Sequence, residues 1–319
     1  MTLLSDRLCV GGAPSTAAAK KLGVVGADVR EISELLAVYD GEPYLAGSLA
    51  AGLGDGHSDI DIHVISDDPV ASEGAALMFT RAGACVDVQY LGRAAVERRL
   101  ATERPGQRIR PSGRSGAWLM SRWLNALPLR ADAPALLSAA QQAKAVEHIT
   151  MSLAGDLIAL TAFAVLAERC PGERAWYLCR RAGIAAWELA ATLAGQHYLG
   201  ERWLPRRSGD PRVAAIADVA CSAAGIAELS WLLGRLGLAV DEAPARVALS
   251  ASPDAERWTI AGEELALVGG RRLVPCTHPV PASAAEAATG DPVSVLRGLA
   301  CGALRWTVDL EGVVPGLES

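Results

Sequence analysis

The chain has 319 residues, 51% of them hydrophobic, so it can bury a large core and is long enough for roughly two or three domains. A formal net charge of −6 argues against bulk electrostatic binding of nucleic acid. The seven cysteines form no CxxC pair and show no metal-site spacing with the five histidines, which predicts free thiols in a reducing cytoplasm. There is no signal-peptide pattern, and the longest apolar run, 157–167, predicts a buried core helix rather than a membrane span.

The first hundred residues alternate between helical and strand patterns. Apolar residues at helical spacing predict an amphipathic helix over 28–39, and a second helix is predicted over 71–82. Alternating residues predict strands over 60–66 and 84–91, and a short strand is expected at 44–46. These elements together predict a small α/β sheet domain, with the boundary set at residues 1–125.

The rest of the chain changes character twice. Residues 104–122 hold five arginines among Pro, Gly and Ser, which predicts a linker or mobile loop. Contact with phosphates or with a nucleic-acid acceptor is the alternative for this segment. Residues 133–238 are helical in pattern, so 126–240 is predicted to be a helical bundle domain. From there to 319 a hairpin at 264–274, a helix after the Asp291–Pro292 cap and a closing strand predict a small α/β module. A winged-helix-like arrangement is one option for this module, and the fold class as a whole is α+β.

Two aspartates one residue apart raise a physical problem in the predicted strand 60–66. Asp59 and Asp61 share a face because alternate strand residues do, and two like charges there repel unless a cation or hydrogen-bond donors compensate. A third aspartate, Asp87, lies between Val86 and Val88 in the next alternating strand. Each feature alone fits a solvated strand face with its apolar neighbours pointing inward.

The order of these residues resembles the signature of the nucleotidyltransferase superfamily. Gly47-Ser48, ten intervening residues, Asp59-Ile60-Asp61 and then Asp87 match its Gly-Ser turn, its paired aspartates and its third carboxylate. Antibiotic nucleotidyltransferases and DNA polymerase beta-type catalytic domains belong to this superfamily. The match covers roughly residues 40–92, under a fifth of the chain.

The resemblance implies a fold, a cofactor and a reaction. Asp59, Asp61 and Asp87 would hold magnesium, with two ions expected, and Gly47 and Ser48 would bind a nucleoside triphosphate. The reaction implied is transfer of a nucleoside monophosphate, AMP from ATP being the first choice, to a hydroxyl of a small acceptor. An aminoglycoside-like sugar or a natural-product intermediate is the acceptor class that the resemblance suggests.

Further candidates have weaker signals. In small-molecule members of the superfamily a helical domain often supplies an acidic general base, for which Glu147 and Asp156 are candidates, although helix-surface roles fit both. Lys144, Arg180 and Arg181 could bind phosphates or simply pair with neighbouring acids. Two histidines flank the aspartates, His57 and His63, and His63 shares the aspartate face. The segment YLGERWLPRR at 198–207 is similar to a short stretch of antibiotic-type enzymes, but it also fits an aromatic staple at the end of a helix.

Three functions therefore stand at this stage. The first is an enzyme acting on a small molecule, and the second is nucleotidylation of a protein or a tRNA. The third is a non-catalytic nucleotide-binding module that retained the fold. Neither nucleic acid nor a membrane is the expected partner, and no motif specifies the nucleobase, the acceptor or the oligomeric state.

Overall fold

The computed structural model describes most of the chain, with short gaps. The described residues are 13–37, 39–67, 75–81, 84–102, 114–170, 175–253, 255–260, 263–268, 272–275 and 280–318. The chain divides into two compact units, each described here by itself. The first unit comprises residues 1–103, 116–146 and 197–199, and the second comprises 104–115, 147–196 and 200–319.

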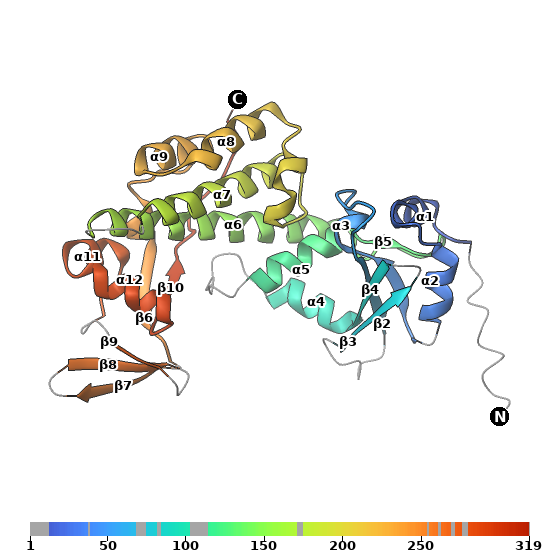
Figure 1. Cartoon of the computed structure of the whole chain (residues 1–319), viewed down its shortest axis with the longest axis horizontal. Coiled ribbons are helices and arrows are strands. Elements are labelled where there is room, and N and C mark those ends of the chain that lie inside the picture. Colours follow the sequence, from blue (N-terminus) through green and yellow to red (C-terminus); the bar gives the residue numbers. More distant parts are fainter. Residues whose placement is uncertain are drawn as a thin grey trace. The chain divides into compact units, whose positions relative to one another are not determined.

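The first unit is built on a five-stranded mixed sheet (Figure 1). Its strands, in spatial order, are β3 (Ala75–Arg81), β4 (Ala84–Gly92), β2 (Ile60–Ser66), β1 (Glu42–Leu45) and β5 (Leu127–Pro128). The central strands β2 and β4 run parallel, and the other neighbours are antiparallel. The small mixed sheet expected from the sequence is therefore confirmed.

One face of this sheet carries the hydrophobic core of the first unit. The helices α1 (Thr16–Leu22) and α2 (Val29–Leu36), joined by the short helix η1 (Gly23–Val25), pack against it. Buried Leu22 and Ile32 from the helices contact the cluster that contains Ile62 and Val88 from the sheet. The amphipathic helix predicted from residue 28 is confirmed, and the Asp28 carboxylate caps it by accepting from the Arg30 N–H at 2.8 Å.

The helix predicted over 71–82 is wrong, because residues 75–81 form β3. The sequence AALMFTR has good helix formers, but its backbone pairs with β4 from Ala75–Tyr90 through to Arg81–Ala84. This antiparallel pairing overrides the local preference. A helix does occur, but it follows the sheet strand as α4 (Arg93–Thr102), while residues 71–74 lie outside the described part of the chain.

The segment 104–122, predicted as a linker, ends in a helix instead. Residues Arg114–Leu124 form α5, which buries Met120 and Trp123. The Pro- and Gly-rich composition comes from the residues before the helix, of which 103–113 are outside the described residues. In Figure 1, α4 and α5 lie on the side of the sheet opposite α1 and α2.

The second unit contains the predicted helical region. Its helices are α7 (Ala175–Leu193), η2 (Glu201–Arg207), α8 (Pro211–Ser222) and α9 (Ile226–Gly234), with most of α6 (Ala139–Glu168). The helices α7 and α8 approach closely at Gly183, where an added Cβ would lie 3.0 Å from the Ala220 carbonyl oxygen. The helical pattern of this part of the sequence is thus confirmed.

The helix α6 is longer and more apolar than the run 157–167 suggested. Among the described helices it is long and apolar enough to cross a membrane by length and composition. However, 67% of its most apolar window is buried inside the protein, which is typical of the core helix of a soluble protein.

The C-terminal elements pack onto the same unit. They comprise α10 (Ala243–Arg246), β6 (Val247–Ala251), β7 (Ala255–Ile260), β8 (Glu263–Val268), β9 (Arg272–Pro275), α11 (Ala284–Thr289), α12 (Pro292–Cys301) and β10 (Leu304–Val308). The predicted hairpin is confirmed as the antiparallel pair β8–β9, and Asp291 caps α12 by accepting from the Ser294 N–H. Phe163 of α6 packs edge-to-face on Trp306 of β10, so the boundary proposed at 240 falls inside one compact unit. The three-domain division stays a prediction.

Candidate active site

The sheet brings two of the predicted carboxylates together. Asp61 on β2 and Asp87 on β4 are register partners in the parallel pair, so both side chains leave the same face. Their neighbours Ile62 and Val88 are also register partners and are buried in the core on the opposite face. Asp59 immediately precedes β2 and is exposed. Alternation along both strands therefore separates a core face from a face that carries carboxylates.

Gly47 lies directly against the carboxylate of Asp61. Its φ of +69° is in the left-handed region, and an added Cβ would lie 1.8 Å from Asp61 Oδ2. The preceding residue fixes this contact, because the Ala46 N–H donates to the Asp61 carbonyl oxygen at 2.8 Å. Gly47 also begins the short helix α3 (Gly47–Ala50). Position 47 thus requires glycine both for its backbone conformation and for its proximity to Asp61.

The turn after Gly47 is held by backbone hydrogen bonds. Ser48 is buried, with 3% exposure, and its carbonyl oxygen accepts from the N–H groups of Leu53 and Gly54, each at 2.9 Å. Gly54 packs tightly, since an added Cβ would lie 2.6 Å from Leu49 Cδ2. Glycine at position 54 therefore permits this close packing. The turn therefore holds Ser48 in a defined position next to the residue that touches Asp61.

An arginine that the sequence placed in a linker contacts the aspartate pair. Arg122 on α5 donates from Nη1 to Asp61 Oδ1 at 2.9 Å, and both side chains are largely buried, at 12% and 13% exposure. The guanidinium lies over the Trp118 ring, 3.6 Å from its centroid. One turn of α5 separates Trp118 from Arg122, so the i,i+4 spacing allows this stacking. Asp61 therefore has Gly47 at one carboxylate oxygen and Arg122 at the other.

Burial controls the ionisation of this face. It raises the pKa of Asp61, and although Arg122 opposes the rise, the negative charges of Asp87 and Asp59 add to it. His63, two residues further along β2, is 1% exposed, and burial with the nearby Arg122 charge lowers its pKa to about 3. His63 is therefore neutral at ordinary pH. Neither of its ring nitrogens has a hydrogen-bond partner among the described residues.

The oxygen atoms of the carboxylate pair are the type of donor that binds a magnesium ion. Magnesium prefers oxygen ligands and is usually bound by one or two carboxylates together with substrate phosphates. Across the described residues, no group of three or more His, Cys, Asp or Glu side chains could hold a metal ion. The sheet places two carboxylates, Asp61 and Asp87, in register. Asp59, Asp61 and Asp87 as magnesium ligands stay predictions.

Five of the weaker candidates lie on the helices α6 and α7. Lys144 and Glu147 are both exposed on α6, but Lys144 belongs to the first unit and Glu147 to the second. Arg180 and Arg181 are on α7 in the second unit, and Arg181 is ion-paired with Glu201 at 2.8 Å. Their roles as a general base and as phosphate contacts stay predictions. Asp156 is half-buried on α6 and His57 is exposed in the turn before β2, and their roles likewise stay predictions.

The segment 198–207 has a structural explanation. Its Arg207 side chain is fully buried, 3.5 Å from Glu188 of α7 through Nη1, and its Nη2 donates to the Gln196 carbonyl oxygen. The same Glu188 carboxylate accepts from the Gly200 N–H at 2.7 Å. Trp203 is also buried. These contacts fasten η2 to α7, which agrees with the helix-end interpretation of this segment.

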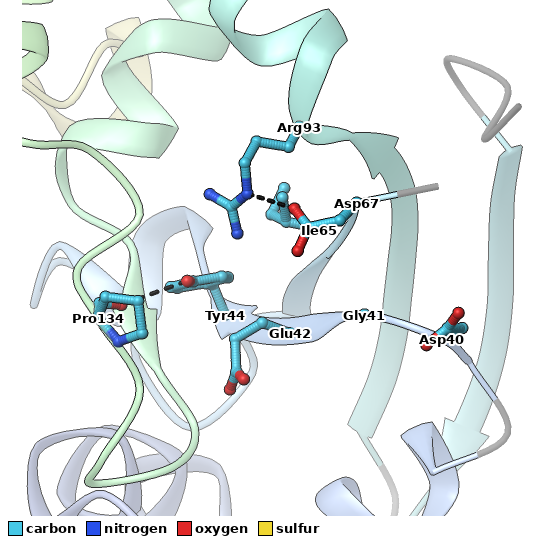
Figure 2. Close-up of a pocket in the computed structure, with 8 residues that line it drawn as sticks. All are labelled: Asp40, Gly41, Glu42, Tyr44, Ile65, Asp67, Arg93 and Pro134. Atoms are coloured by element: carbon cyan, nitrogen blue, oxygen red, sulfur yellow. Dashed lines mark hydrogen bonds and ion pairs between the residues drawn. The ribbon is translucent and has the colours of Figure 1, made fainter. Parts of the chain in front are cut away.

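A polar cavity of about 430 Å³ opens at the other end of β1 and β2 (Figure 2). Arg93 donates to Asp67 at 2.6 Å inside it, and the Tyr44 hydroxyl donates to the Pro134 carbonyl oxygen at 3.2 Å. Burial, with the adjacent Glu42 charge, raises the pKa of Tyr44. The cavity contains none of the predicted site residues. It is lined by Asp40, Gly41, Glu42, Tyr44, Ile65, Asp67, Arg93 and Pro134.

Two cations near the Gly-Ser turn were not singled out as site residues, although phosphate contact was one alternative for the segment that contains Arg122. Arg122 is one, and the Trp118–Arg122 spacing within GAWLMSRWL is the signal that points to a helix at this position. Lys21 on α1 is the other, because its Nζ lies 2.5 Å from where a Cβ on Gly52 would be. The contact between Lys21 and Gly52 joins residues far apart in the sequence, so no local pattern reveals it.

Comparison with known proteins finds similarity among solved structures. No protein-family model matches the chain, and no curated protein matches it in sequence. Among solved structures, the chain is similar to a nucleotidyltransferase-like protein from Exiguobacterium sibiricum 255-15. The identity is 16%, the TM-score is 0.30, and the similarity covers 69% of this chain and 75% of the other.

Proposed function

We propose that the chain is a magnesium-dependent nucleotidyltransferase that moves a nucleoside monophosphate, AMP from ATP, onto a hydroxyl of a small molecule. The acceptor class would be an aminoglycoside-like sugar or a natural-product intermediate, and pyrophosphate would be released. One observation carries the proposal: the carboxylates of Asp61 and Asp87 leave neighbouring parallel strands in register, with the Gly47-Ser48 turn against Asp61. This geometry supports the site that the resemblance implies.

The residues of the turn and the sheet have separate tasks in the proposed reaction. Glycine at 47 lets phosphate oxygens approach the backbone, and the Ser48 hydroxyl donates to a phosphate oxygen. The acceptor oxygen bonds to the α-phosphorus, the bond from the α-phosphorus to pyrophosphate breaks, and the hydroxyl proton passes to a carboxylate, for which Glu147 is the candidate. Magnesium held by Asp59, Asp61 and Asp87 would neutralise charge on the transferring phosphate.

A non-catalytic nucleotide-binding module is the second candidate. The observation in its favour is the Arg122–Asp61 ion pair, because Arg122 already supplies the positive charge that a metal would bring to Asp61. A module of this kind would bind a triphosphate without turning it over. The two candidates therefore differ in turnover rather than in nucleotide binding.

Pyrophosphate release distinguishes these functions. The protein is given each nucleoside triphosphate with magnesium, against a panel of aminoglycosides and related amino sugars. The enzyme releases pyrophosphate only when a suitable acceptor is present, and Asp87→Asn abolishes that release. Asp67→Asn is the matched control, since Asp67 is exposed beyond the far end of β2 and should leave the rate unchanged. Acceptor-dependent release that survives Asp87→Asn would contradict the proposed site.

A further inference from the structure

We propose that Arg122 is a triphosphate-binding residue that holds Asp61 in the free protein and exchanges that carboxylate for the phosphates when nucleotide and metal bind. The inference rests on the proposed function and names a residue that the signature does not contain. It starts from an ion pair that occupies the carboxylate nearest the Gly-Ser turn.

The first argument is charge. Arg122 Nη1 is 2.9 Å from Asp61 Oδ1, so the guanidinium occupies a position from which it competes with any cation for that oxygen. Asp61 is buried next to Asp87, and a buried carboxylate without a counter-charge is unfavourable. Arg122 supplies that counter-charge in the free protein. A metal ion bound to Asp61 would supply the same counter-charge, and the guanidinium could then bind another anion.

The second argument is the unused hydrogen-bonding capacity of the guanidinium. An arginine has five N–H donors, and within the described residues Arg122 makes one hydrogen bond, to Asp61. Its buried Nε has no partner among those residues. Phosphate oxygens match the planar fork of a guanidinium. The free donors therefore suit a phosphate ligand better than they suit the single aspartate contact.

The third argument is the way the side chain is supported. The guanidinium lies 3.6 Å from the Trp118 ring centroid, and stacking of this kind holds its plane without using its N–H groups. Asp61 is the ion-pair partner of Arg122 among the described residues, so movement of the guanidinium to a phosphate breaks no other ion pair there.

The experiment measures metal and nucleotide binding separately, without turnover. Mn²⁺ affinity is measured by electron paramagnetic resonance in the absence of nucleotide, and ATP affinity is measured by calorimetry at saturating Mg²⁺ with no acceptor present. Wild type and Arg122→Gln are compared at the same pH, about pH 8. Arg93→Gln is the matched control, because Arg93 is also ion-paired to an aspartate, at the other end of β2.

The exchange predicts that loss of Arg122 changes the affinities for Mn²⁺ and for ATP in opposite directions. Arg122→Gln should bind Mn²⁺ about tenfold more tightly and ATP about tenfold more weakly than wild type, the factor that one charge-assisted hydrogen bond commonly provides. Arg93→Gln should change neither. If Arg122→Gln fails to fold, Trp118→Leu keeps the charge and removes only the stacking surface, and a smaller Mn²⁺ gain is expected.

Two results would overturn the inference and are distinguishable from each other. If wild type binds Mn²⁺ and ATP but Arg122→Gln changes both no more than Arg93→Gln does, the exchange is wrong and the proposed function stands. If neither wild type nor Arg122→Gln binds Mn²⁺ or ATP, the exchange and the proposed function are both wrong.

Discussion

Gly47 packs against the carboxylate of Asp61 so closely that a Cβ at position 47 would lie 1.8 Å from Asp61 Oδ2. This contact joins the Gly-Ser turn to the sheet strand that carries the aspartate. It explains why the two halves of the sequence signature, ten residues apart, belong to one site. It also makes position 47 a sensitive test of the site.

Gly47→Ala should therefore lower the free energy of unfolding more than alanine does at another glycine in the left-handed region. Gly26 is the matched control, since its φ is +71° but an added Cβ meets nothing within 4 Å. Left-handed strain alone costs about 1–2 kcal/mol at either position. Gly47→Ala should add the steric conflict with Asp61 and lose triphosphate binding, while Gly26→Ala keeps it. Thermal unfolding and calorimetry check this, and equal effects of the two substitutions would contradict the contact.

The buried Arg207 should be essential to the stability of the second unit. Arg207→Ala leaves the Glu188 carboxylate without its buried partner, and breaking such a pair costs about 3–5 kcal/mol. Arg206→Ala is the control, because Arg206 is the exposed neighbour in the same short helix. Denaturant unfolding measures both variants. Equal free energies of unfolding would show that Arg207 does not fasten η2 to α7.

Asp210 should titrate well below an ordinary aspartate. Its side chain accepts hydrogen bonds from the side chain and the backbone N–H of Arg212, which lowers its pKa from 3.8 to about 2. Because the folded-state pKa is below the unfolded value, this group stabilises the fold above pH 3.8 and the effect is lost as pH falls toward 2. A carboxyl-carbon NMR titration, assigned with Asp210→Asn, tests this. A midpoint near the ordinary value would show that the capping contacts are absent.

The strands that carry the aspartates could be predicted from the sequence, because their alternation is local. IDIHVIS and ACVDVQYL each place branched or aromatic residues at every second position, and the structure has β2 at Ile60–Ser66 and β4 at Ala84–Gly92. The face on which Asp61 and Asp87 lie in their strands follows from that alternation. Their register, however, depends on strand pairing, which no single segment specifies.

The elements that were missed depend on contacts between distant residues. The strand β3 has residues that favour a helix, and its strand conformation comes from pairing with β4. Arg122 lies 61 residues from Asp61, and its contact requires α5 to pack on the aspartate face of the sheet. The Pro- and Gly-rich residues before α5 favoured a linker for the whole segment, so the helical spacing of Trp118 and Arg122 was not used. Local patterns therefore located the carboxylates but not the cation beside them.

Calorimetry of magnesium–triphosphate binding tests the central claim most directly. ATP with magnesium is titrated into wild type, Asp61→Asn and Asp87→Asn, with circular dichroism to show that each variant is folded. We expect saturable, magnesium-dependent binding to wild type that both substitutions abolish or greatly weaken, because each removes a carboxylate from the register pair. A folded wild-type protein that binds no nucleoside triphosphate with magnesium, or binding that neither substitution changes, would contradict the account.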